Sequence, residues 1–288
     1  MNDYLLSLIL GVIEGLTEFL PVSSTAHLRI AEAFLGIDLQ SGFWKMYSIV
    51  IQLGAILALT IFFWRRILRF LGTFPQGENG DRNFVTHPLS LVMIAFVVTA
   101  IPAFLLTKLI GKNLENLSVM VAALFIGGVI MWAVDALFVR PKIVEMAQIR
   151  LPAAIWIGAV QILSAIFPGT SRSMCTIAAG QVAGLSREAA LEFSFFLSIP
   201  TMFAACGYDL LKTLKPHHTT DAIAPLTMTP HLWVVTAIGF VVAFSVAFAV
   251  VAWFLHWVRR HGFTAFAIYR IFLAIALFVL LTRGMIGR

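Results

Sequence analysis

Charged residues and cysteines are both scarce in this chain of 288 residues. Asp, Glu, Lys and Arg together make up 12% of the sequence, and two cysteines are present. Soluble domains contain about 25% charged residues, so this chain has too little polar surface for a water-soluble globule. Cys175 and Cys206 are too few for a disulfide framework and lack the spacing of metal ligands. A soluble domain and a disulfide-stabilised scaffold are both excluded.

The positive charge does not indicate a nucleic-acid partner. The net charge is +6, but the basic residues stand singly or in pairs at the ends of apolar runs. This pattern is typical of anchors at a membrane surface. The N-terminal segment MNDYLLSLIL has no basic residue before its apolar stretch, so we expect it to remain in the mature protein. We predict membrane lipid, and no nucleic acid, as the surroundings of this protein.

Long apolar runs dominate the sequence instead. Hydrophobic residues make up 60% of the chain, and its mean hydropathy is +0.94. A membrane-spanning helix needs about 20 apolar residues. Runs of this kind cover residues 44–64, 88–110, 117–138, 190–211, 232–257 and 265–282. The sequence predicts an all-α integral membrane protein with six full spans, whose longest polar connections are 67–87 and 212–231.

Two shorter apolar runs, 4–20 and 152–167, differ from the six spans. Each ends at a proline and is followed by a second short stretch with small and hydroxyl residues, at 23–36 and 170–184. Two short helices joined at a break are typical of a re-entrant hairpin, which is tolerated at membrane depth where the break lines a cavity. We therefore predict two re-entrant helical hairpins.

The two predicted hairpins resemble each other. Residues in the first match residues 147 positions later, about half the chain. The matched pairs are Gly11 with Gly158, Glu14 with Gln161, Leu16 with Leu163, Thr17 with Ser164, Pro21 with Pro168, and Ser24 with Ser171. We predict a single membrane domain, 1–288, built from pseudo-repeats at about 1–140 and 148–288. Three spans separate the hairpins, so the repeat should have inverted topology and bring residues 14–27 beside residues 161–176.

Two acidic residues stand out in the first hairpin. Glu14 and Glu18 are four positions apart on an apolar helix, so their Cβ atoms should be about 5–6 Å apart on one face. Two carboxylates so placed repel each other, and one must hold a proton, pair with a cation or bind a metal. We predict that the two residues are functional and, as a hypothesis, that they bind a metal. The alternative is that each is a structural acid with its own hydrogen-bond partners or faces water.

Hydroxyl groups and a histidine follow Pro21. Ser23 or Ser24 can cap a new helix, and His27 lies three positions after Ser24 on the same face. This spacing offers a nucleophile, a base within reach, and helix N-terminal amides for an anion. We expect Ser24 and His27 to be catalytic and Ser23 and Thr25 to bind phosphate; the alternative role for a serine here is helix capping alone.

The second break predicts a cradle for an anion. A glycine lets a ligand approach the backbone, hydroxyls and first-turn amides can donate, and an arginine supplies a planar fork for phosphate oxygens. The residues concerned are Gly169, Thr170, Ser171, Arg172, Ser173 and Thr176. Arg172 could instead neutralise Glu14 or Glu18, and the two roles are compatible if substrate displaces the pair.

These motifs closely resemble the bacterial undecaprenyl-diphosphate phosphatase family of the bacitracin-resistance type. The segment from Glu14 to His27 contains the family's (E/Q)xxxE motif, and the segment PGTSRSMCT contains its PGxSRSxxT motif. The resemblance covers essentially the whole chain. It implies that the functional positions are Glu14, Glu18, Ser24, His27, Ser171, Arg172, Ser173 and Thr176.

The resemblance also implies an activity. It predicts a hydrolase that removes the terminal phosphate of undecaprenyl diphosphate, recycles the lipid carrier of cell-wall peptidoglycan, confers bacitracin resistance and needs a divalent cation, Mg²⁺ or Ca²⁺. We expect in-line attack on the terminal phosphorus, with Ser24 as nucleophile or water-positioning group and His27 as base or acid. Glu14 and Glu18 would hold a cation or position a proton, and Arg172 would bind the phosphoryl group. Direct attack by water is the alternative mechanism. The alternative function is a transporter or flippase for an anion or lipid phosphate, since such proteins share this repeat.

Basic residues suggest an orientation in the membrane. Arg65, Arg66 and Arg69 follow the first predicted span, and Arg259 and Arg260 follow the fifth. Arginine-rich ends tend to be cytoplasmic, so we predict a multi-pass protein of the bacterial inner membrane whose active site opens to the periplasmic or outer face, possibly as a homodimer. Arg172 and Arg270 are left out of this comparison of basic residues. The roles of Asp135 and Glu192 stay open, with local pairing favoured for both.

Overall fold

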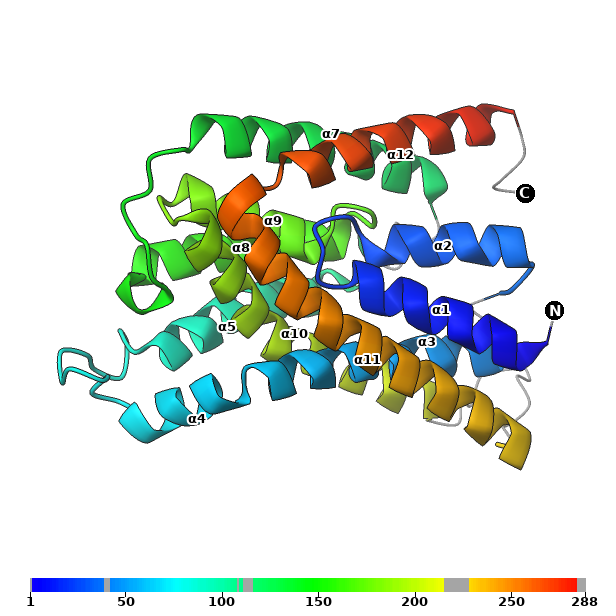
Figure 1. Cartoon of the computed structure of the whole chain (residues 1–288), viewed down its shortest axis with the longest axis horizontal. Coiled ribbons are helices and arrows are strands. Elements are labelled where there is room, and N and C mark those ends of the chain that lie inside the picture. Colours follow the sequence, from blue (N-terminus) through cyan, green and yellow to red (C-terminus); the bar gives the residue numbers. More distant parts are fainter. Residues whose placement is uncertain (1, 39–41, 108, 111–115, 215–227, 284–288) are drawn as a thin grey trace.

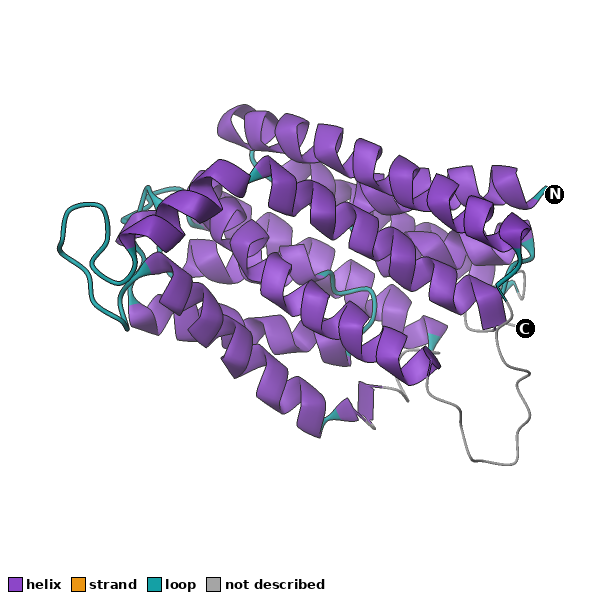
Figure 2. Ribbon diagram, turned by 90° about the horizontal axis from the view of Figure 1, so that it is seen from below, coloured by secondary structure: helices purple, strands orange, loops and turns teal. Residues whose placement is uncertain are grey.

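The computed structural model describes residues 2–38, 42–107, 109–110, 116–214 and 228–283. Helices make up nearly all of this part of the chain, and it contains no strand (Figure 2). Six of its helices are long and apolar enough to cross a membrane. The predictions of an all-α membrane protein and of six spans are both confirmed.

The six long helices correspond to the six predicted spans. They are α3 (Gly42–Phe62), α5 (Pro88–Leu105), α7 (Leu117–Leu137), α10 (Arg187–Leu214), α11 (Pro230–His261) and α12 (Thr264–Thr282). Helix α5 ends at Leu105, before the predicted end at 110, and α11 continues past residue 257 because the polar Arg259, Arg260 and His261 extend its last turn. Cations are favourable at a helix C-terminus, where the carbonyl groups lack partners.

Four short helices form the two predicted pairs. They are α1 (Asp3–Thr17) with α2 (Ser24–Leu35), and α8 (Leu151–Ile166) with α9 (Arg172–Val182). Both connecting turns lie in the interior, and the open ends of the two pairs face opposite ends of the molecule (Figure 1). Their description as re-entrant hairpins, and the division into pseudo-repeats, stay predictions.

The turns themselves are built around two serines in an unusual conformation. Ser23 and Ser171 have φ angles of 73° and 71°, and they are the only non-glycine residues with positive φ in the described part of the chain. Such backbones cost about 1–3 kcal/mol each. Each serine caps the next helix, accepting a hydrogen bond from the amide three residues later. The stretch from the proline to the capping serine is one residue longer in the second turn, Pro168 to Ser171, than in the first, Pro21 to Ser23. Ser171 therefore corresponds in position to Ser23, and the predicted match with Ser24 is wrong by one residue.

Glycines let each short pair pack closely against a distant span. A Cβ at Gly15 would lie 2.7 Å from Cβ of Val246 in α11, and a Cβ at Gly158 would lie 2.4 Å from the carbonyl oxygen of Ala95 in α5. Small residues at such contacts bring helix backbones together in membrane proteins. Helix α1 therefore packs on a span of the second half of the chain, and α8 packs on a span of the first.

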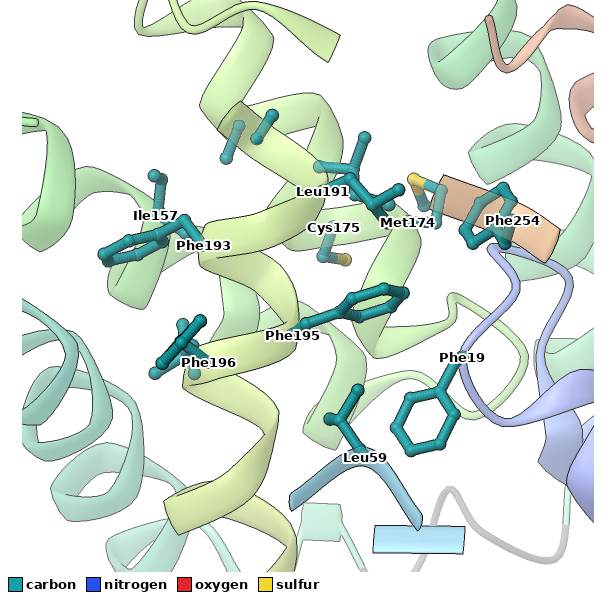
Figure 3. Close-up of a cluster of buried hydrophobic side chains, with 14 of the residues drawn as sticks. Phe19, Leu59, Ile157, Met174, Cys175, Leu191, Phe193, Phe195, Phe196 and Phe254 are labelled. Carbon is teal, nitrogen blue, oxygen red and sulfur yellow. The ribbon is translucent and has the colours of Figure 1, made fainter. Parts of the chain in front are cut away.

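An apolar cluster fixes the first turn against the long helices. Phe19, directly after the predicted acidic residue Glu18, is fully buried and meets the ring of Phe195 edge to face, with centroids 5.7 Å apart. Figure 3 shows Phe19 extending from the turn into the cluster, where Leu59 and Phe195 lie beside its ring. Burial of large aromatic side chains supplies much of the packing energy of a core. Packing of Phe19 thus fixes the turn that carries Glu18.

Polar residues near one end of the bundle pair with one another. The predicted loop 67–87 begins as part of a helix, α4 (Trp64–Thr73), whose Arg66 forms an ion pair with Glu192 of α10. Asp135 is buried and accepts hydrogen bonds from Arg187 Nε at 2.6 Å and from Thr264 Oγ1 at 2.9 Å. Asp135 and Glu192 therefore both have partners close by. Most of the other predicted loop, 212–231, lies outside the described residues.

Candidate active site

The carboxylate of Glu18 joins the two turns. Its Oε2 accepts a hydrogen bond from Ser24 Oγ at 2.5 Å, and its Oε1 accepts one from Arg172 Nη2 at 3.3 Å. The side chains of Glu18 and Arg172 are 9% and 13% exposed, so this ion pair is largely shielded from water. The predicted proximity of the two motifs is confirmed, because Ser24 and Arg172 meet at opposite oxygens of one carboxylate.

Glu14 lies one helical turn before Glu18 and is fully buried. Among the described residues, neither of its carboxylate oxygens has a hydrogen-bond partner. The matched residue of the second half, Gln161, is also buried, but its amide donates to Thr99 Oγ1 at 3.2 Å and Thr201 Oγ1 at 3.3 Å. A buried carboxylate without partners is costly unless it holds a proton or meets a cation. Glu14 therefore provides acceptor atoms that the protein itself does not use.

Arg172 provides the complementary free donor. Its Nη1 is buried and has no hydrogen-bond partner in the part of the chain that the structure describes, while Nη2 binds Glu18. Arg172 is also the first residue of α9, and Ser24 is the first residue of α2. First-turn amides of a helix have no acceptor within the helix and attract anions. Two helix N-termini and a guanidinium thus converge on Glu18.

The other predicted phosphate ligands differ in whether their hydroxyl groups already have hydrogen-bond partners. Ser23 and Ser171 act as helix caps, and Ser171 Oγ also contacts Ser173 Oγ at 3.1 Å. Thr170 Oγ1 donates to the carbonyl of Phe167 at 2.7 Å. Thr25 is exposed on the first turn of α2. In this structure, these hydroxyls stabilise the turns or lie at the surface rather than surrounding Glu18.

Three predicted residues of the second motif have structural partners. Ser173 Oγ donates to the carbonyl of Leu20 in the first turn at 3.0 Å, and Thr176 Oγ1 lies 2.6 Å from Ser194 Oγ of α10. Gly169 has a φ of 91°, and a Cβ there would lie 2.5 Å from the carbonyl oxygen of Met120. Ser173 and Thr176 therefore attach α9 to its neighbours, and Gly169 allows α7 to approach the turn.

His27 forms no hydrogen bond with Ser24 in the described structure, although we expected it to serve Ser24 as base or acid. Its Nδ1 donates to the carbonyl of Ser23 at 2.8 Å, because a carbonyl can only accept, and in the neutral ring its Nε2 accepts from Tyr269 OH at 2.6 Å. The rings of His27 and Tyr269 are stacked. The hydroxyl of Ser24 is directed to Glu18 instead. Geometry thus favours Glu18 as the group that takes the proton of Ser24.

Arg270 of α12 is a residue that the sequence analysis missed. It is fully buried, and its guanidinium donates to the carbonyls of Pro21 in the first turn and of Gly169 and Thr170 in the second. One signal for it was present, since a lone arginine within an apolar span is expensive and usually functional. Tyr269 was missed as well, because its contact with His27 joins distant parts of the sequence.

The fold and this site define a class of protein: a multi-pass helical membrane protein in which a shielded Glu–Arg ion pair lies at two helix N-termini. The chain belongs to the family described as bacitracin resistance protein BacA, whose model matches residues 7–276. A relative from Koribacter versatilis named undecaprenyl-diphosphatase is 60% identical over 280 residues, which cover 96% of this chain and 97% of the relative. A relative of the same name from Rhizobium etli is 41% identical over 286 residues, covering 99% of this chain and 100% of the relative.

Proposed function

We infer that this protein is an enzyme that hydrolyses undecaprenyl diphosphate to undecaprenyl phosphate and inorganic phosphate. Its membership of the family and the names of its relatives support this activity. The observation that carries it is the carboxylate of Glu18, which binds the Ser24 hydroxyl at 2.5 Å and the Arg172 guanidinium at 3.3 Å. These three groups can supply a nucleophile, a base and a phosphate ligand. The product is the carrier that cell-wall synthesis reuses, and removal of the diphosphate accounts for bacitracin resistance.

The reaction begins at Ser24. Its Oγ transfers a proton to Glu18 and attacks the terminal phosphorus, while the bond from this phosphorus to the bridging oxygen breaks. Undecaprenyl phosphate leaves with that electron pair, and water then cleaves the phosphoserine to release phosphate. Arg172 moves from Glu18 to the phosphoryl oxygens, where its free Nη1 adds a second donor. Preorganised donors of this kind stabilise the charge that develops in the transition state.

Glu14 and Glu18 fit a divalent cation, Mg²⁺ or Ca²⁺. The unpartnered oxygens of Glu14 are hard ligands, and Mg²⁺ is commonly held by one or two carboxylates together with substrate phosphates and water. No group of three or more acidic, histidine or cysteine side chains suited to a metal occurs in the described ranges, so substrate oxygens would complete the coordination. When bound, the cation would neutralise part of the diphosphate charge.

The orientation and surroundings of the enzyme are part of the same proposal. We place it in the bacterial inner membrane, with membrane lipid around its apolar helices and the arginine-bearing end, which includes Arg66 of α4, in the cytoplasm. The α1–α2 pair opens toward the opposite end of the molecule (Figure 1), so the site should be reached from the periplasmic face. A cysteine at the exposed position Asn79 tests this, since Cys175 and Cys206 are buried. Labelling by an impermeant reagent from the outside would reverse the orientation. Formation of a homodimer stays a prediction.

Phosphate release by the purified protein in detergent tests the activity. Detergent removes the two compartments, so a transporter or flippase would give no product, whereas a phosphatase would release phosphate. Ser24→Ala should abolish release, and Ser245→Ala is the matched control, because Ser245 is an exposed serine of α11 whose hydroxyl donates within its own helix, to Val241 O. A substrate labelled in its terminal phosphate should transiently label Ser24. Active wild-type protein that never takes up the label would mean that water attacks directly.

A further inference from the structure

Arg270 binds backbone carbonyls from three separate segments. Its Nη1 donates to Pro21 O at 3.1 Å, and its Nη2 donates to Gly169 O and Thr170 O, both at 3.0 Å, and to Ala123 O of α7 at 3.3 Å. One nitrogen thus binds the first turn and the other binds the second turn. A planar guanidinium can serve several acceptors at fixed angles, which a lysine ammonium on a flexible chain cannot reproduce.

The charge of Arg270 has no carboxylate partner. Within the described part of the chain, Arg172 pairs with Glu18, and Arg187 pairs with Asp135, but no acidic side chain lies within ion-pair distance of Arg270. Its acceptors are all neutral carbonyls. Burying a charge is unfavourable unless nearby dipoles or an anion compensate it. An anion bound at the two turns would supply that compensation.

Two glycines of α7 leave space for the side chain of Arg270. Gly127 and Gly128 are consecutive in α7, where a Cβ would lie 2.5 Å from Arg270 Nη2 at the first position and 3.2 Å from Arg270 Cβ at the second. No larger residue fits at Gly127 unless the guanidinium shifts. The position of the Arg270 side chain therefore depends on α7 as well as on the two turns.

We propose that Arg270 is a positioning residue for the phosphatase reaction. Pro21 precedes Ser24 by three residues, and Gly169 precedes Arg172 by three, so three of the four carbonyls that Arg270 binds lie in the turns that carry these groups. By holding both turns, Arg270 sets the position of Ser24 and Arg172 about Glu18, and its unpaired charge favours the anionic substrate. This role rests on the proposed function, because it concerns the same reaction.

Two substitutions separate geometry from charge. Arg270→Lys keeps the charge but loses the fork, so kcat should fall about 10²-fold, as expected for a misplaced reacting group, while KM stays within about threefold of the wild-type value. Arg270→Met also loses the charge, so KM should rise in addition. Inorganic pyrophosphate provides a readout besides activity: it should raise the melting temperature of the wild type and of Arg270→Lys, and do so less for Arg270→Met.

Three further variants keep the test valid if Arg270 substitutions fail to fold. Gly127→Ala leaves the arginine in place but pushes against its Nη2 and against Met174 Cε, so it should lower kcat in the same way. Gly207→Ala in α10 is the matched control, since a Cβ there meets nothing within 4 Å, and its kcat should equal that of the wild type. Arg187→Lys controls for loss of an arginine fork that binds a buried carboxylate, Asp135, and should change stability but not kcat.

The outcomes separate this proposal from the proposed function. Wild-type protein that releases no phosphate contradicts the enzyme activity itself. If the wild type is active, a folded Arg270→Lys protein with kcat within twofold of the wild type refutes the positioning role. A fall in melting temperature with unchanged kinetics refutes it too, because Arg270 would then only stabilise the fold.

Discussion

Replacement of Glu18 by Gln tests the central contact of the site. Glutamine has nearly the same shape but carries no charge, and one of its two terminal atoms donates rather than accepts. The variant therefore deprives Ser24 of its proton acceptor and Arg172 of its ion-pair partner in one step. Because Arg172 is then free to bind phosphate, turnover and substrate binding should respond in opposite directions.

The size of each effect follows from the contacts. Loss of a positioned general base typically costs about 10²–10⁴ in rate, so kcat should fall by that factor. Removing one partner of a buried ion pair can cost about 3–5 kcal/mol of stability. Here Glu14 lies close enough to interact electrostatically with Arg172, and its oxygens have no hydrogen-bond partner among the described residues. Its charge can offset part of the buried charge of Arg172 without binding the guanidinium, so we expect the unfolding free energy to fall by less than about 3 kcal/mol.

Phosphate release measured across substrate concentrations gives kcat and KM, and thermal unfolding gives the stability. We expect a lower kcat, a KM equal to or below that of the wild type, and a modest loss of stability. Glu188→Gln is the matched control, because Glu188 forms an exposed ion pair with Arg259 that contributes about 1 kcal/mol or less. If Glu18→Gln keeps more than a tenth of the wild-type kcat, Glu18 is not the base for Ser24.

Three further predictions follow from the same contacts. Glu14→Gln should raise the concentration of Mg²⁺ needed for half-maximal activity; an unchanged requirement would assign Glu14 to proton transfer or structure. Arg172→Lys keeps the charge but loses the fork, so kcat should fall about 10²–10³-fold with near-normal melting temperature, and near-normal turnover would reduce Arg172 to a structural ion pair. Burial lowers the pKa of His87, which caps α5 by accepting from the Leu89 amide. Its contribution to stability should be complete above about pH 6.5 and decline as the pH falls from there toward the lowered native pKa, and His87→Asn should remove this dependence in thermal unfolding.

The sequence predicts those parts of the fold that depend on composition and counting. Apolar runs locate the six spans, prolines locate the breaks after α1 and α8, and the odd number of spans between them predicts that Ser24 and Arg172 meet. These features follow from hydropathy and chain direction, which need no side-chain geometry.

Other parts of the site depend on geometry that the residue pattern does not contain. Arg270 binds backbone carbonyls, which every residue carries, so its partners have no sequence signature. The three-residue spacing from Ser24 to His27 favours contact on a helix, but the imidazole ring of His27 forms a hydrogen bond with Tyr269 of α12 instead. The extra residue between Pro168 and Ser171 shifts the correspondence between the halves after the proline, because a turn can absorb an insertion that a helix cannot.

The exchange of packing partners between the two halves has a consequence for biogenesis. Helix α1 is among the first segments to leave the ribosome, yet the surface that covers Gly15 belongs to α11, which is translated almost last. The glycine face of α1 must therefore stay in contact with lipid or the insertion machinery until most of the chain has been made. Nascent chains that end before Pro230 should leave a cysteine in place of Ser7 open to labelling, because the hydroxyl of Ser7 donates to Val235 O of α11, and full-length chains should protect it. Early protection would mean that α1 finds a temporary partner within its own half.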